Sequence, residues 1–228
     1  MAEKKVKIRC GDSDCRSNLH CYQQARRVAK KKTTMAKQGR TGNGGGGGLD
    51  GTPSGVAVSR RRCRDCGAAL VDWKRLEKRS LRDFEYTLTA LKTELIRHHY
   101  WLHATLGPRA VNYARRKGKR GMKSALTQHL KKAIGDAHPF RDGWQTPYGD
   151  EDQGSRILFF AQHATASCCR KCVEIWHGIP TGDELPDEVI DYLTKLTMRY
   201  VADRIPDLAE DPIYVAPIRN ANQAKPKS

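Results

Sequence analysis

The eight cysteines of this chain are its strongest folding constraint, because they fall into two groups far apart in the sequence. The first group, which a glycine-rich stretch divides, consists of Cys10, Cys15, Cys21, Cys63 and Cys66. The second group consists of Cys168, Cys169 and Cys172. The N-terminus lacks the apolar stretch of a secretory signal. The sequence also contains no run of about 18 apolar residues, the length needed to cross a membrane. We therefore expect a cytoplasmic protein, with no membrane partner, whose reduced thiols bind metal.

The first group has the spacing of a zinc site. The stretch "CRDCG" (63–67) places two thiols around a tight turn, so that both can face one ion. Cys10 and Cys15 are expected to supply the other two ligands, and His20 or Cys21 could take the place of Cys15. The spacing therefore predicts a first zinc ion, which binds to Cys10, Cys15, Cys63 and Cys66.

Composition divides the chain into segments. Residues 35–58 include five consecutive glycines and few apolar side chains, so they cannot bury enough surface to offset the entropy of ordering them. We expect a flexible, disordered insertion there, within a small zinc-ribbon-like module formed by residues 1–78. Residues 79–208 are predicted to form a helical domain with the second cysteine group, and residues 209–228 a disordered tail. The predicted fold class is mainly α.

Apolar residues recur at three- and four-residue steps through most of the helical domain, which is typical of amphipathic helices. Helices are predicted over residues 80–106, 109–134 and 161–177, and from Pro186 onward. The basic helix 109–134 is weakened in its middle by two glycines. The last helix has an apolar face formed by Val189, Ile190, Leu193, Leu196, Tyr200 and Val201. Weak strand signals occur at residues 56–58, 69–71 and 157–160.

The second cysteine group lies between two histidines. On a helix over residues 161–177 the three thiols would lie close to one face, with His163 before them and His177 after them. This spacing predicts a second zinc ion, which binds to His163, Cys169, Cys172 and His177. Packed core thiols, or a Cys–His pair in nucleophilic or redox chemistry, are the alternatives. His99 and His103, four residues apart, are weaker candidate ligands.

Charge is distributed unevenly along the chain, whose net charge is +17. Residues 1–135 contain 32 Lys and Arg against 10 Asp and Glu, whereas residues 136–212 contain 7 against 15. A basic front half favours a polyanionic partner such as DNA or RNA, and an acidic back half favours a protein partner. The candidate nucleic-acid-binding residues are Arg60, Arg61, Arg62, Arg64, Tyr113, Arg115, Arg116, Lys117, Lys119, Arg120 and Lys123.

Three short stretches resemble a known family. "DGWQTP" (142–147), "AQHATASCCRKC" (161–172) and "WHGIP" (176–180) are similar to the signature of a bacterial family catalogued as domain of unknown function 4186. The resemblance covers about residues 80–205. It implies that the signature residues are Asp142, Gln145, Thr146, Gln162, His163, Thr165, Cys168, Cys169, Arg170, Cys172, Trp176 and His177. The family name supplies no activity.

The signature mixes metal-binding residues with acidic and cationic ones, which favours a functional pocket. Asp142 is a candidate general base, Arg170 a candidate for stabilising an anion, and His163 a further catalytic candidate. The whole pattern predicts a zinc-dependent nucleic-acid-binding protein with two zinc ions. A metal-assisted nuclease that uses residues 163–177 is one alternative. A small subunit of a ribonucleoprotein or defence complex is another.

Overall fold

The computed structural model describes residues 8, 11–22, 61–140, 142–143 and 156–218, and these residues are mainly helical. The elements are η1 (Cys15–Ser17), α2 (Trp73–Glu77), η2 (Leu81–Asp83), α3 (Phe84–Lys92), α4 (Leu95–His98), η3 (His99–His103), α5 (Pro108–Leu130), η4 (Lys131–Gly135), α6 (Arg156–Ala164), α7 (Arg170–His177) and α8 (Asp187–Arg204). The expected fold class is confirmed. The stretch 69–71 forms no strand and 157–160 lies in α6, whereas 56–58 lies outside the described residues. None of the described helices is long and apolar enough to cross a membrane.

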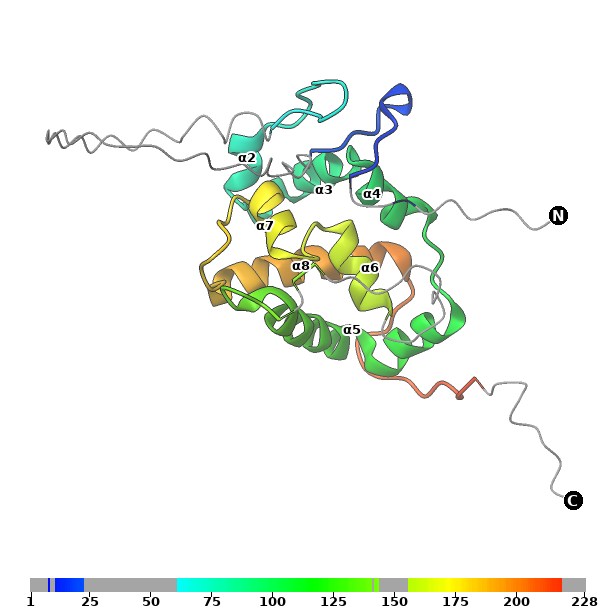
Figure 1. Ribbon diagram of the computed structural model, residues 1–228. Coiled ribbons are helices and arrows are strands. Elements are labelled where there is room, and N and C mark those ends of the chain that lie inside the picture. Colours follow the sequence, from blue (N-terminus) through cyan, green and yellow to red (C-terminus); the bar gives the residue numbers. More distant parts are fainter. Residues whose placement is uncertain (1–7, 9–10, 23–60, 141, 144–155, 219–228) are drawn as a thin grey trace, which may run out of the picture.

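The main core forms around α8, which runs through the middle of the molecule and packs against α5 and α6 (Figure 1). The predicted apolar face of α8 is buried at every position, namely Val189, Ile190, Leu193, Leu196, Tyr200 and Val201. Its helical spacing therefore identified the side chains that build this core. Burial of such side chains is the main favourable contribution to folding.

The helix predicted over residues 80–106 is interrupted at Glu94. This residue has an extended backbone, with φ −90° and ψ 129°, between α3 and α4. The backbone of His20 lies beside the break, where its N–H donates to Thr93 O at 2.8 Å and its carbonyl accepts from Leu95 N at 3.0 Å. After the break, the apolar side chain of Leu102 is 56% exposed. Pairing with a distant segment has therefore replaced helical continuity.

The helix predicted over residues 161–177 is also two helices, α6 and α7. The chain turns between them at Ala166, whose φ of 55° is incompatible with a continuing right-handed helix. Cys169 is the N-cap of α7, and its Sγ accepts from Cys172 N at 3.4 Å. The second cysteine group therefore lies in a turn and at a helix start rather than along one helix face.

A second, smaller core joins the N-terminal segment to the helices. The ring of Tyr22 packs edge-on against Trp73 at 5.3 Å and against Trp176 at 5.5 Å, measured between ring centroids. These side chains come from residues 11–22, α2 and α7. Edge-to-face aromatic contacts of this kind stabilise a core beyond the area they bury. The division between residues 1–78 and 79–208 stays a prediction, and this cluster contains residues from both.

The basic helix, expected to be weakened in its middle, is kinked at Gly118 in α5. Its φ of 63° and ψ of 178° are non-helical, and a Cβ there would lie 2.4 Å from the backbone carbon of Asp211. Glycine is therefore required, because only its backbone lets the C-terminal segment approach this closely. Lys119 N donates to Ala209 O at 2.9 Å, and Ile213 N donates to Arg115 O at 3.1 Å. The start of the predicted disordered tail thus packs on α5, while residues 219–228 lie outside the described ones.

Candidate metal centres

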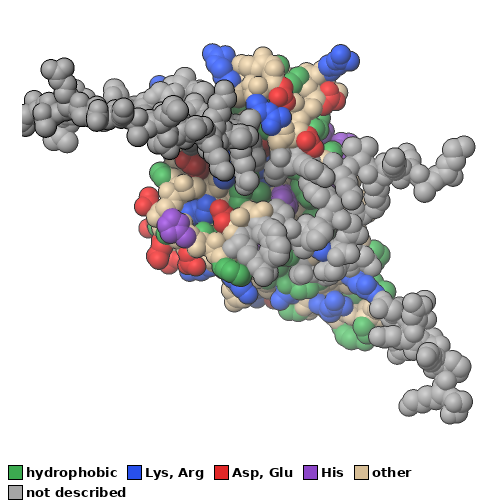
Figure 2. Space-filling view, viewed as in Figure 1, with side chains coloured by type: hydrophobic (Ala, Val, Ile, Leu, Met, Phe, Trp, Pro, Cys, Tyr) green, Lys and Arg blue, Asp and Glu red, His purple; other side chains and the backbone are tan. Residues whose placement is uncertain are grey.

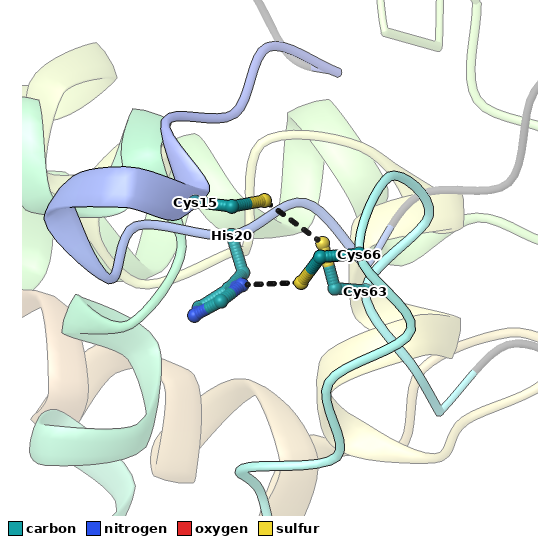
Figure 3. A group of neighbouring side chains, drawn as sticks. All are labelled: Cys15, His20, Cys63 and Cys66. Carbon is teal, nitrogen blue, oxygen red and sulfur yellow. Dashed lines mark hydrogen bonds between the residues drawn. The ribbon is translucent and has the colours of Figure 1, made fainter.

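Four candidate ligands from two distant loops meet at one point, where Figure 3 shows their donor atoms turned toward one another. These are Cys15, His20, Cys63 and Cys66, whose ligand atoms all lie within 4.8 Å of one another. Cys15 Sγ lies 3.7 Å from Cys63 Sγ, and Cys66 Sγ lies 3.4 Å from His20 Nδ1. Two sulfurs bound tetrahedrally to zinc at about 2.3 Å would be about 3.8 Å apart. The four side chains therefore fit one tetrahedral ion.

Local backbone structure places the two thiols of the second loop. Gly67 N donates to Cys63 O at 2.9 Å, and Cys63 N donates to Ala68 O at 2.8 Å. The turn requires a φ of +74° at Gly67, which a residue without Cβ adopts at little cost. The glycine after the Cys-x-x-Cys pair therefore has the function that the sequence predicted for it.

A hydrogen bond sets the orientation of the His20 ring. His20 Nε2 lies 3.0 Å from Asn18 Oδ1, an oxygen that can only accept, so Nε2 carries the proton. The other ring nitrogen, Nδ1, is then free of a proton and faces the thiols. Metal-binding histidines generally hold their second nitrogen in such a bond. An ion held by this group would therefore bind His20 through Nδ1.

The thiols differ in how readily they ionise. Burial raises the pKa of Cys63, but hydrogen bonds with the backbone of residues 21, 66 and 65 oppose it, and the pKa is lowered to about 6. Burial and a hydrogen bond with Cys66 raise the pKa of Cys15 to about 11. A cation would ionise the remaining thiols and release their protons.

The predicted ligand set is only partly brought together. Cys15, Cys63 and Cys66 lie in one group as expected, whereas Cys10 lies outside the described residues. His20, expected only as a replacement for Cys15, lies beside it instead. The Cys15-to-His20 spacing of four intervening residues was the signal available in the sequence.

The second group contains Cys168, Cys169 and Cys172, whose sulfurs lie within 4.8 Å of one another. Arg97 reaches this group from α4 and is fully buried. Its Nη2 donates to Cys172 Sγ at 3.1 Å, and its Nη1 lies 3.7 Å from Cys168 Sγ. The guanidinium also forms an ion pair with the buried Glu94, at 3.1 Å between Nε and Oε2. No local pattern around Arg97 predicts that it belongs to this site.

The two histidines predicted as ligands are not in this group. The ring of His163 stacks on Tyr100, with the ring centroids 4.7 Å apart. His177 Nε2 lies 2.9 Å from the carbonyl oxygen of Thr165, to which it donates. Similarly, His99 and His103 stack 6.3 Å apart without joining a three-ligand group among the described residues.

Residues 85–202, more than half of the chain, match the family model described as Domain of unknown function (DUF4186). This chain belongs to the DUF4186 family. The resemblance of the three sequence stretches is thereby confirmed. The family description names no activity, so the match supports no particular function. No solved structure matches the chain.

Two signature residues of the DUF4186 family hold the backbone around the second group. Arg170 is 1% exposed, and its terminal nitrogens donate to the carbonyl oxygens of Asp136 at 2.7 Å, Asp183 at 2.6 Å and Pro180 at 2.8 Å. Asp142 Oδ1 accepts from Arg170 N at 2.9 Å, at the start of α7. These contacts are structural, so they do not support an anion-binding role for Arg170 or a general-base role for Asp142.

Other signature residues of the DUF4186 family fix the turn before α7. Gln162 Nε2 donates to Ser167 O at 3.1 Å, and Thr165 Oγ1 donates to Ala161 O at 2.8 Å. Trp176 Nε1 donates to Glu94 Oε2 at 2.8 Å, which connects α7 to the break between α3 and α4. The signature therefore describes mainly the frame of the three thiols. Gln145 and Thr146 lie outside the described residues.

Most of the predicted nucleic-acid-binding residues have partners within the protein. Arg61 forms an ion pair with Glu77 at 2.7 Å, and Arg64 Nη2 donates to Gly11 O at 2.6 Å. On α5, Arg115 pairs with Asp207 at 2.7 Å and Arg120 with Asp211 at 3.0 Å, and Lys117 lies over the ring of Tyr113. Arg62, Arg116 and Lys123 are exposed, Lys119 is half-buried, and Arg60 lies outside the described residues.

We expect His177 to make stability depend on pH. Burial lowers its pKa to about 4, whereas an unfolded histidine titrates near about 6.5. Between these values the unfolded chain binds a proton that the folded one does not, so stability falls as pH drops from about 6.5 toward 4. Between pH 7 and pH 5 the free energy of unfolding, measured with urea, should fall by about 2 kcal/mol more in the unaltered protein than in His177→Gln. Equal losses would contradict this assignment.

Proposed function

We propose that this member of the DUF4186 family is a zinc-dependent nucleic-acid-binding protein. The observation that carries the zinc part is the meeting of Cys15, His20, Cys63 and Cys66 within 4.8 Å. Three thiolates and one imidazole form a ligand set typical of structural zinc, and four protein ligands leave the ion no open position. Thiolates and imidazole also favour zinc over hard cations such as magnesium.

The bound ion would hold two loops together. Cys15 and His20 belong to residues 11–22, while Cys63 and Cys66 follow the segment 23–60 in the sequence. Holding the two ends of a long loop together costs the chain conformational entropy. Here the free energy of metal binding would offset that cost. The second loop contains Arg61, Arg62 and Arg64, so the ion would also fix the position of these cations.

Positive charge supports the nucleic-acid part of the proposal. Figure 2 shows Lys and Arg side chains around the two loops at the top of the molecule and along its lower edge, where α5 lies. In this view the cations around the two loops and those along the lower edge lie apart. Exposed ion pairs such as Arg120–Asp211 contribute only about 0–1 kcal/mol each, so a phosphate can replace the carboxylate.

The nucleic-acid part is tested by salt dependence. We expect binding of labelled DNA or RNA, followed by fluorescence anisotropy, to weaken steeply with salt because phosphate contacts release counterions. Removing the exposed cations Arg116 and Lys123 with glutamine should lower the slope of log K against log salt by about 2. Lys195→Gln removes one positive charge on α8 and should leave the slope unchanged. A flat salt response of the unaltered protein would contradict the proposal.

The same assay addresses the nuclease alternative. Asp142 and Arg170, two of its proposed catalytic residues, bind backbone groups around α7. We therefore expect the labelled strands to remain intact, with or without added divalent ions. Metal-dependent cleavage would favour the nuclease instead.

A protein partner is the remaining alternative, and it has one supporting observation. Figure 2 shows carboxylate side chains gathered at one edge of the molecule. Exposed acidic residues lie between α7 and α8 and at the start of α8, namely Asp183, Glu184, Asp187 and Glu188. This surface fits a basic partner, and it would stay accessible while the cationic surfaces bind phosphate.

A further inference from the structure

We propose that Cys168, Cys169 and Cys172 form a second metal site of a different kind, which binds a soft divalent ion such as zinc through three thiolates and accepts a small thiol as fourth ligand. The sulfurs lie within 4.8 Å of one another, as one ion requires. Each coordinating thiol releases its proton to solvent when the ion binds. This site does not depend on nucleic-acid binding.

Hydrogen-bond donors of the protein face two of the three sulfurs, those of Cys172 and Cys169. A guanidinium only donates hydrogen bonds and stays charged, so the sulfurs that Arg97 faces are acceptors. Arg97 Nη2 lies 3.1 Å from Cys172 Sγ in a fully buried position. The backbone N–H of Cys172 donates to Cys169 Sγ at the positive end of α7. Both contacts stabilise the negative charge that a trithiolate site carries.

The fourth position would be left for an external ligand. His163 stacks on Tyr100, and His177 donates to Thr165 O, so neither imidazole joins the thiols. No fourth Cys, His, Asp or Glu among the described residues joins the group. Zinc in proteins is generally four-coordinate, and sites with three protein ligands bind water or substrate at the fourth position.

The accessible side of the site is the Cys169 side. Cys172 is fully buried and Cys168 is 7% exposed, whereas Cys169 is only partly buried. A ligand therefore approaches from the N-terminal end of α7. A thiol matches the softness of the other three ligands.

The first test counts zinc in the full-length protein, purified without chelator. We expect two ions per chain in the unaltered protein, and one in each of Cys172→Ser and Cys66→Ser. Cys21→Ser replaces a buried cysteine whose sulfur is in neither cluster of candidate ligand atoms, and it should keep both ions. Cys169→Ser, at the less buried thiol, repeats the test if Cys172→Ser fails to fold. Unchanged zinc content in Cys169→Ser would overturn the proposal. So would a Cys169–Cys172 disulfide in a protein that contains one ion.

The second test examines the fourth position. Cobalt(II) replaces zinc in the full chain, and 2-mercaptoethanol is then titrated while the d–d absorption bands are recorded. We expect the bands to shift in the unaltered protein and in Cys66→Ser, but not in Cys172→Ser. Absence of any shift in the unaltered protein would mean that no external thiol reaches the metal, and would overturn the proposal of an open fourth position.

Arg97 is a positioning residue in this proposal, because it acts through the thiolates. We expect Arg97→Gln to weaken zinc binding at the second site by about 10- to 100-fold, as the loss of a hydrogen bond to a metal ligand generally does. Its zinc uptake should also require a higher pH, whereas Arg97→Lys, which keeps the charge, should recover part of the loss. Equal zinc affinities in the unaltered protein, Arg97→Gln and Arg97→Lys would show that Arg97 has no role at the second site.

Discussion

Replacing Cys66 with serine is expected to remove the first zinc ion and to lower the melting temperature by about 10–15 °C. Cys66 is exposed, so the substitution itself loses little packing. Structural zinc contributes about 10 kcal/mol or more to small zinc domains. We expect the loss of the ion to lower the free energy of unfolding by about 3–5 kcal/mol here, because the helical core remains. In a chain of this size, each 1 kcal/mol lowers the melting temperature by about 2–4 °C.

The effect should be local as well as thermal. The two loops that would lose their ion continue into Tyr22 and Trp73, which pack on Trp176. Tryptophan fluorescence should therefore shift toward that of exposed indole in Cys66→Ser, and a chelator should give the same shift in the unaltered protein. Cys21→Ser should bind zinc and melt near the unaltered protein. An unaltered melting curve for Cys66→Ser would show that the four ligands hold no structural ion.

The helices could be predicted wherever the apolar pattern alone decides them. The face of α8 around Leu193 follows directly from its spacing, and the weakness around Gly118 follows from glycine propensity. The breaks at Glu94 and Ala166 could not be predicted this way, because partners far away in the sequence create them. The backbone of His20 pairs at the first break, and no local pattern indicates that pairing.

The candidate sites show the same limit. Cysteine spacing predicted Cys63 with Cys66 and Cys169 with Cys172 as ligands, because short Cys-x-x-Cys pairs fix their own geometry. It did not predict Cys168 as a ligand. It did not identify Arg97, since nothing in a single sequence distinguishes a buried arginine from an exposed one. Counting cations likewise does not reveal which of them have partners within the protein, such as Arg115, which pairs with Asp207 across 92 residues.

Replacing Arg97 with methionine is expected to lower the free energy of unfolding by about 3–5 kcal/mol, because it leaves the buried carboxylate of Glu94 without its cation. Both side chains of this ion pair are fully buried. Arg97 also donates to the carbonyl oxygen of His163 at 2.6 Å, so the turn before α7 loses a support. Urea unfolding at pH 7 measures the loss.

A double variant separates the unpaired charge from the lost packing. Glu94→Gln combined with Arg97→Met removes both charges, while the glutamine oxygen can still accept from Trp176 Nε1. Replacing a whole buried pair is generally far less costly than removing one partner. The double variant should therefore be more stable than Arg97→Met alone, by about 2 kcal/mol. If it were less stable, the destabilisation would come from lost contacts of Arg97 and not from the charge left on Glu94.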